Sequence, residues 1–202
     1  MVVRIMFTLP TFFDVRRGIK SWLDLGNWLL GDCVIAAWLH LTMVHNVAKA
    51  STWKKLLYRI GYRPPHDPFA VEEYTAFLAT LHEKPSGTQG VDPFTFFSWL
   101  KANNKIEDFQ SIPATLDAIH AAMIEWDGCM LILNLTNRAY NIGLSHQPWI
   151  LEPGDVPNPM LGHAVALVEY GPEMNGIVTW GEMKDMSNDF SNECVYACWV
   201  FR

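Results

Sequence analysis

Residues 113–136 read PATLDAIHAAMIEWDGCMLILNLT, and within this stretch the pattern changes from that of a helix to that of a strand. The first part, Pro113–Trp126, predicts a helix that ends at Asp127-Gly128. The second part, Cys129–Thr136, is apolar almost throughout and predicts a buried strand. Helices are expected before this point and strands after it. The chain is therefore predicted to be an α+β protein with segregated halves.

Three further helices are predicted ahead of this change, because apolar residues recur there at helical spacing. They span Asp32 to about Ala48, Ala70–Glu83 and Phe94–Ala102. Asp32 and Asp92 are candidate N-caps for the first and third of these helices. Prolines and glycines predict loops over Arg59–Pro68 and Lys84–Asp92. The aromatic run Phe94–Trp99 is interpreted as core or as the wall of a cleft.

An antiparallel sheet is predicted after the change. Alternation in His163–Tyr170 indicates a strand, and a turn at Met174–Gly176 leads into a second strand, Ile177–Trp180. Val195–Arg202 closes the chain with one more strand. The intervening segment Asn137–Leu161 carries four prolines and is predicted to be irregular.

The length of 202 residues suits one domain, with a helical part over about residues 20–126 and a β part over 127–202. With 50% hydrophobic and 18% charged residues, the chain cannot be a disordered protein. The net charge is −6, and Lys and Arg form no cluster longer than a pair. Nucleic acid is therefore not an expected partner.

The longest apolar stretch, Leu25–Val44, approaches the length of a membrane span. Asn27, Asp32 and His40 interrupt it, so a buried helix is expected and a membrane partner is not. The N-terminal residues 1–18 lack the apolar core of a signal peptide. The cysteines form no C-x-x-C pair, and those other than Cys33 are expected to be buried, reduced thiols. Reduced cysteines of this kind favour a cytoplasmic location.

Cys33 and His163 are the candidate reactive pair. Cys33 falls in the first turn of its predicted helix, where free N–H groups and the helix dipole favour a thiolate. A cysteine nucleophile needs a histidine as proton shuttle, and His163 follows Gly162 at the start of a strand. From these residues alone, a nucleophile and a plain core cysteine are equally supported. Asp32 is interpreted as a helix cap rather than a catalytic acid, and its charge would disfavour the thiolate.

Three segments, in this order, resemble the papain superfamily of cysteine peptidases. They are NWLLGDC (27–33), GHAVALVEYG (162–171) and VTWG (178–181). The motifs GDCVIAA from Gly31 and VTWGEMKDM from Val178 are most similar to uncharacterised papain-like proteins of actinobacteria and their phages. The resemblance extends from about Asn27 to Val200. It implies a papain-like fold in which the catalytic helix packs on the C-terminal sheet.

By this resemblance, Cys33 would be the nucleophile and His163 the general base and acid. Asn27 would supply the oxyanion-hole amide at a position where papain has Gln. The position that orients the histidine falls on Val178 or Thr179, depending on the hairpin register. Only threonine could accept the imidazole hydrogen bond.

Three other residues are expected around the cleft: Trp180 as a shield over the histidine contact, with Trp28 and Gly162 beside it. The loops expected to line the cleft are Tyr58–Pro68, Lys84–Phe94 and Asn137–Leu161. The histidines and carboxylates show neither H-x-x-x-H nor H-E-x-x-H spacing, so no metal and no cofactor is expected.

The resemblance implies a peptidase or amidase that cleaves a peptide or isopeptide bond of a peptide or protein substrate through a thioester acyl-enzyme. A weak or inactive papain-like fold with a structural or interaction role is the alternative. Such a protein could be a phage virion component, with other virion proteins as partners, in the host cytoplasm or the virion. An acyltransferase on the same scaffold is a third hypothesis.

Overall fold

The structure is a computed structural model that describes residues 9–16, 19, 21–27, 30–49, 67–86, 90–143 and 145–202. The described helices are α1 (Cys33–Lys49), α3 (Asp67–Thr80), α4 (Pro93–Ala102), α5 (Leu116–Trp126), α6 (Asn137–Ile142) and α7 (Asn188–Cys194). The strands are β1 (Phe13–Asp14), β2 (Phe109–Ile112), β3 (Cys129–Thr136), β4 (Pro157–Tyr170), β5 (Met174–Thr179), β6 (Glu182–Ser187) and β7 (Val195–Phe201).

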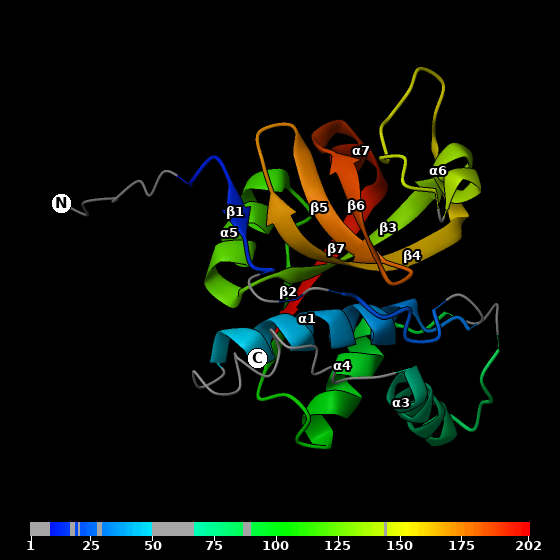
Figure 1. Ribbon diagram of the computed structural model, residues 1–202. Coiled ribbons are helices and arrows are strands. Elements are labelled where there is room, and N and C mark those ends of the chain that lie inside the picture. Colours follow the sequence, from blue (N-terminus) through cyan, green and yellow to red (C-terminus); the bar gives the residue numbers. More distant parts are fainter. Residues whose placement is uncertain are drawn as a thin grey trace.

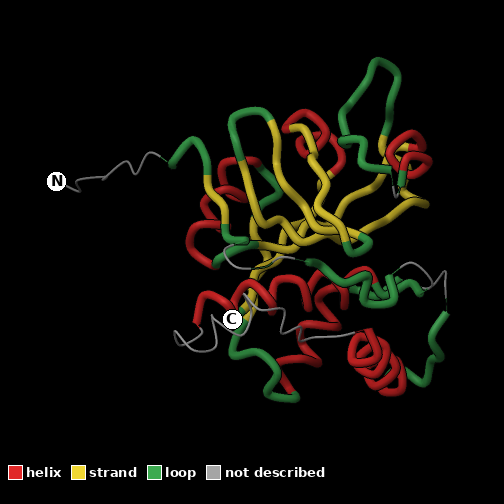
Figure 2. The backbone as a smooth tube through the Cα atoms, viewed as in Figure 1, coloured by secondary structure: helices red, strands yellow, loops and turns green. Residues whose placement is uncertain are grey.

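The strands form one antiparallel sheet with helices on both faces. Its order is β2-β7-β3-β4-β5-β6, and the short β1 pairs with β4. Helices α1, α3 and α4 lie below the sheet in Figure 1, and α5 and α7 lie on its other side. Figure 2 shows the same layers by type of secondary structure. The expected mixture of helices and an antiparallel sheet is confirmed.

Side-chain alternation along the central strands builds a core on each face of the sheet. On β3, Met130 and Ile132 pack with α1, α3 and α4, whereas Leu131 and Leu133 pack with α5 and α7. Successive side chains of a strand point to opposite faces, so a wholly apolar strand must be covered on both. The last helix of the expected helical part, α5, therefore lies across the sheet from α1.

The long predicted elements lie close to their expected positions. β3 has the predicted bounds, α1 begins at Cys33, and the carboxylate of Asp92 caps α4 by accepting from the N–H of Thr95 at 2.8 Å. The run Phe94–Trp99 is mostly core: Phe96 and Phe97 are fully buried, whereas Phe94 is exposed. The predicted loop over Arg59–Pro68 lies outside the described residues up to residue 66, and α3 already begins at Asp67.

Two predictions about the β half are wrong. The segment Asn137–Leu161 is not irregular throughout, because it contains α6 and the start of β4 at Pro157. Helix α6 is too short to show a period, and it is fixed by a cap in which Thr136 Oγ1 accepts from the N–H of Ala139 at 3.0 Å.

The turn predicted at Met174–Gly176 is instead the start of β5, and the chain reverses just before it, where Gly171 N–H donates to the carbonyl of Met174. Asn175 has turn chemistry, but its buried amide donates to Asn188 and Ser191 instead.

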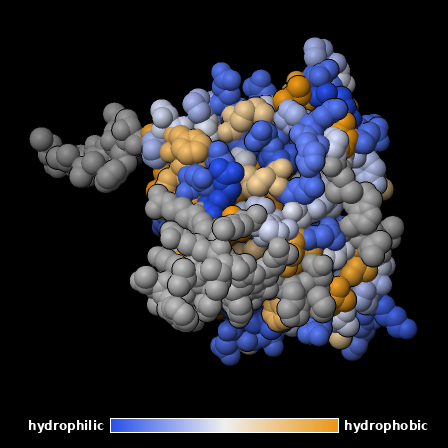
Figure 3. All heavy atoms as spheres, in the orientation of Figure 1, coloured by the Kyte–Doolittle hydropathy of each residue, from blue (hydrophilic) through white to orange (hydrophobic). Residues whose placement is uncertain are grey.

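Hydrophilic side chains prevail over the described surface seen in Figure 3, with hydrophobic ones scattered among them. None of the described helices combines the length and the apolar character needed to cross a membrane. All four cysteines are free: Cys129, Cys194 and Cys198 are buried as predicted, whereas Cys33 is only partly buried.

Candidate active site

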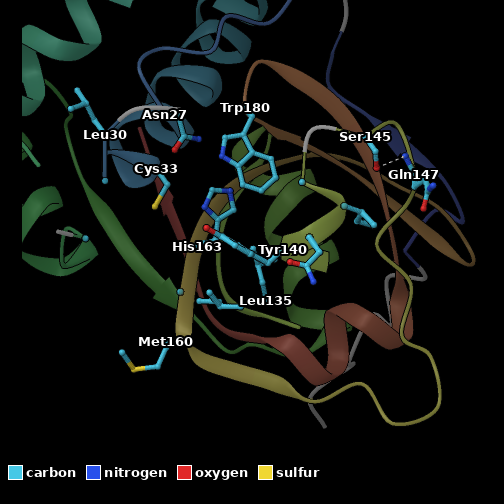
Figure 4. A pocket seen from close by; sticks show the side chains of 17 residues that line it. Asn27, Leu30, Cys33, Leu135, Tyr140, Ser145, Gln147, Met160, His163 and Trp180 are labelled. Carbon is cyan, nitrogen blue, oxygen red and sulfur yellow. Dashed lines mark hydrogen bonds between the residues drawn. The ribbon is translucent and has the colours of Figure 1, made fainter. Parts of the chain in front are cut away.

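A pocket of about 1050 Å³ opens where the start of α1 meets β4 and the turn after β5 (Figure 4). Five residues singled out in the sequence line it: Asn27, Cys33, Gly162, His163 and Trp180. The pocket thus gathers side chains from four separate parts of the chain. Trp28, expected beside the cleft, lies outside the described residues.

Cys33 is the first residue of α1, and the carbonyl of Asp32 accepts the first helical hydrogen bond from Ala36 at 2.9 Å. Burial raises the pKa of the Cys33 thiol to about 11, and the charge of Asp32 acts in the same direction. Backbone hydrogen bonds from Ala164, Val34 and Cys33 itself lower the pKa, but by less. Burial therefore opposes the thiolate that the helix start is expected to favour.

The imidazole of His163 is held on two sides. Its Nε2 lies 2.6 Å from Oγ1 of Thr179, and the indole of Trp180 stacks on the ring with centroids 4.7 Å apart. Burial lowers the pKa of His163 to about 4, so the ring is neutral at pH 7. Of the two residues considered for orienting this histidine, Thr179 makes the contact, whereas Val178 faces the α1 side of the sheet.

Cys33 and His163 are neighbours in the pocket. The residue after His163 is Ala164, whose backbone bonds to the Cys33 sulfur. Figure 4 shows the imidazole between Cys33 and Trp180, with one ring nitrogen on the side of Cys33. Within the described part of the chain no hydrogen bond joins the thiol to the ring. Since Thr179 takes Nε2, Nδ1 is the nitrogen left for the cysteine.

Asn27 is 7% exposed and ends a strap, defined here as residues 21–27. His40 Nε2 lies 2.8 Å from the carbonyl oxygen of Leu23, which ties the strap to α1. On the other side the strap lies against Gly181, where an added Cβ would be 2.8 Å from the backbone nitrogen of Asp24. The strap is therefore held from both sides at Leu23 and Asp24, and the backbone N–H of Asn27 donates to the carbonyl of Asp24 at 3.2 Å.

Asp32 is fully buried, and neither of its carboxylate oxygens has a hydrogen-bond partner among the described residues. Burial, followed by the charge of Asp24, raises the pKa of its carboxyl group to about 7. The side-chain cap predicted here is wrong, because only the Asp32 carbonyl takes part in starting α1.

Several pocket residues were not individually predicted from the sequence: Tyr140, Asn141, Ile142, Ser145, Gln147 and Met160. They belong to the segment Asn137–Leu161, which was expected to line the cleft as a loop. Gly90, from the expected loop Lys84–Phe94, lines it too. The Thr136-x-x-Ala139 cap of α6 was the signal that could have located the first three. In the described residues no group of three or more His, Cys, Asp or Glu could hold a metal ion.

Neither a protein-family model nor a curated protein matches the chain. Several solved structures match the chain. Xylellain, a cysteine protease from Xylella fastidiosa, matches 96% of this chain and 87% of its own, with a TM-score of 0.59 at 14% identity. Digestive procathepsin L 3 of Tenebrio molitor matches 98% and 72%, with a TM-score of 0.66 at 10% identity. The Carica candamarcensis cysteine protease CMS1MS2 matches 95% and 98%, with a TM-score of 0.60 at 12% identity.

The chain has the papain-like fold. The expected fold class is thereby confirmed, with α1 packed on the antiparallel sheet. Identities this low establish the fold alone. The closer similarity to actinobacterial and phage proteins stays a prediction. Within this papain-like fold the described pocket holds a thiol, an imidazole with an oriented ring and a carboxamide, which together are the groups needed for acyl transfer.

Proposed function

We propose that this protein is a cysteine-dependent hydrolase, a peptidase or amidase that cleaves a peptide or isopeptide bond through a thioester on Cys33. The observation that carries the proposal is the His163 ring, held between Thr179 and Trp180 in the pocket that Cys33 lines. A merely structural histidine would not need one nitrogen anchored and the other left on the side of Cys33.

In the proposed reaction, the Cys33 sulfur attacks the substrate carbonyl carbon while Nδ1 of His163 accepts the thiol proton. Both groups begin neutral, because burial raises the pKa of the thiol and lowers that of the imidazole. Proton transfer therefore accompanies attack. The oxyanion forms beside the side chain of Asn27 and the N–H of Cys33. His163 then gives its proton to the leaving amine, and water hydrolyses the thioester.

Acylation by an activated ester, read by intact-protein mass spectrometry, tests this proposal. We expect one acyl group on Cys33, and about a hundredfold slower acylation in His163→Ala, in the range typical of a general base. His82→Ala is the matched control, because His82 is exposed and is not part of the described pocket lining. Equal acylation rates in the wild type and His163→Ala would show that His163 is not the base.

The neutral state of both groups also favours a second candidate, a papain-like protein that has lost catalysis and acts as a structural or interaction protein. A phage virion component is the form expected from the sequence. For this candidate, Cys33→Ala leaves particles normal and the protein copurifies in stoichiometric amounts with particle proteins. Loss of cleaved products in the same variant would instead support the hydrolase.

A further inference from the structure

His163 divides the pocket into two sides, one for the acyl part of the substrate and one for the departing amine. When a thioester forms, the acyl carbon bonds to Cys33, and the departing amine receives its proton from His163. The released part of the substrate must therefore extend past His163, away from Cys33. Figure 4 shows Tyr140, Ser145 and Gln147 in that direction.

Ring packing supports this placement. Trp149, two residues beyond Gln147, lies with its ring 6.0 Å from Trp180 and 6.3 Å from His163. Its backbone is fixed to β6, because Trp149 N–H donates to the carbonyl of Asp185 at 2.8 Å. Residues 145–149 thus lie against the His163 side of the site as a fixed wall. We call this wall, together with Tyr140, Asn141 and Ile142 of α6, the leaving-group wall.

The leaving-group wall presents no charged side chain to the pocket. Its lining consists of Tyr140, Asn141, Ile142, Gly143, Ser145 and Gln147. No Asp, Glu, Lys or Arg is found among any of the described residues that line the pocket. Tyr140 is 55% exposed, which leaves an aromatic face open to a ligand. Such a surface suits apolar and amide groups.

Glu182, 45% exposed, lies 3.4 Å from Nδ1 of His146 in this wall but is not among the described residues that line the pocket. Two other charged residues near the wall are engaged elsewhere. Lys184 is buried, and its ammonium group donates to the carbonyls of Ser145 and Gln147 from behind the wall. Arg138 of α6 pairs with Glu152 at 2.8 Å and Asp155 at 3.1 Å. A charged side chain of a substrate would therefore lose water here without gaining a counter-charge from the described lining of the pocket.

We propose that the leaving-group wall determines specificity and accepts substrates whose residues after the scissile bond are uncharged, with an apolar or amide side chain against Tyr140. This inference rests on the proposed function, because it assigns the two sides of the pocket from thioester chemistry. It names the substrate class as a peptide or protein segment that is neutral on its released side.

Aminolysis of the acyl-enzyme tests the wall without a known substrate, because an incoming amine must bind where the leaving amine departs. The amine nitrogen attacks the thioester carbonyl, an amide forms, the C–S bond breaks, and the amine proton passes through His163 to the sulfur. Acyl-Cys33 is prepared with an activated ester and treated with the amides of leucine, glutamine, lysine or aspartate at equal concentration. We expect the leucine and glutamine amides to react at least about tenfold faster, the usual scale of pocket discrimination.

Two glutamate variants connect this preference to the wall. Tyr140→Glu is expected to slow the leucine amide by about tenfold and to speed the lysine amide. Val156→Glu is the matched control, since Val156 is 69% exposed and is not part of the pocket lining. Equal rates for all four amides, or equal effects of both variants, would overturn the assignment of the wall alone. Failure to form any acyl-enzyme would overturn the proposed function and this inference with it.

Discussion

Oγ1 of Thr179 lies 2.6 Å from Nε2 of His163, and this contact determines which ring nitrogen is left for Cys33. Thr179 is 2% exposed, so no water replaces its hydroxyl if that group is removed. A hydroxyl both accepts and donates, and here it can hold the tautomer that carries its proton on Nε2. The nitrogen Nδ1 is then free to accept the thiol proton.

Thr179→Val keeps the shape of the side chain and removes the hydroxyl. We predict that acylation of Cys33 slows by roughly five- to a hundredfold, because an unsatisfied buried donor costs about 1–3 kcal/mol. Thr179→Ser retains the hydroxyl and should keep most of the rate. Activated-ester kinetics on the three proteins measure this effect. A Val variant as fast as the Ser variant would show that the contact does not orient the ring.

The buried carboxyl group of Asp32 predicts a pH-dependent stability. Its pKa is raised to about 7, so the folded protein holds a proton there that the unfolded chain has lost between about pH 4 and pH 7. Stability contributed by this site is therefore present below pH 4 and is lost as pH rises through 7. Asp32→Asn should raise Tm at pH 8, by roughly 2–4 °C per kcal/mol regained, and change it little at pH 4.

The same variant should also affect the neighbouring thiol. The charge of Asp32 raises the pKa of Cys33, so Asp32→Asn is expected to speed acylation at pH 8. Glu125→Gln on the exposed side of α5 is the control for removing one negative charge. If both variants change Tm and acylation equally, the effect comes from net charge and not from the buried position.

The protonation of His163 is expected to set the low-pH limit of the acylation rate. Only the neutral ring can accept the thiol proton, and burial lowers its pKa from 6.5 to about 4. The acylation rate should therefore stay level as pH falls through 6 and decline to half near pH 4. Stopped-flow acylation with circular dichroism at each pH separates this loss from unfolding. A midpoint near 6.5 would contradict a buried, neutral ring.

The register of the β4–β5 hairpin resolves the one site residue that the sequence left open. Val178 lies opposite Ala166, and both belong to the core beside α1. Val165 lies on the other face, as His163 does two residues earlier on β4. Thr179 must therefore share the face of His163, because neighbouring residues of a strand point to opposite sides.

Other features of the site depend on packing that no local pattern reveals. Cys33 sits at a helix start as predicted, but the sign of its pKa shift depends on burial by residues distant in sequence. Tyr140 could not be predicted from periodicity, because α6 has only 6 residues, fewer than two turns. Longer elements such as α1 and β3 could be predicted from the sequence, because many residues contribute to the pattern of each.

The lack of a side chain at Gly181 lets the strap of residues 21–27 reach the turn after Trp180. A Cβ added there would lie 2.8 Å from the nitrogen of Asp24 and 3.1 Å from the carbonyl carbon of Leu23. Gly181 also has a φ of +76°, which strains any other residue. Gly181→Ala should therefore shift the strap and with it Asn27.

We predict that Gly181→Ala lowers kcat by up to the roughly hundred- to thousandfold expected for losing one oxyanion donor, with a smaller effect on KM. Gly154→Ala is the matched control: its φ of +91° imposes similar strain, but an added Cβ meets nothing within 4 Å. In an Asn27→Ala background, Gly181→Ala should cause little further loss of kcat, since the amide it positions is already gone. Additive losses in the double variant would mean that Gly181 supports the fold and does not position Asn27.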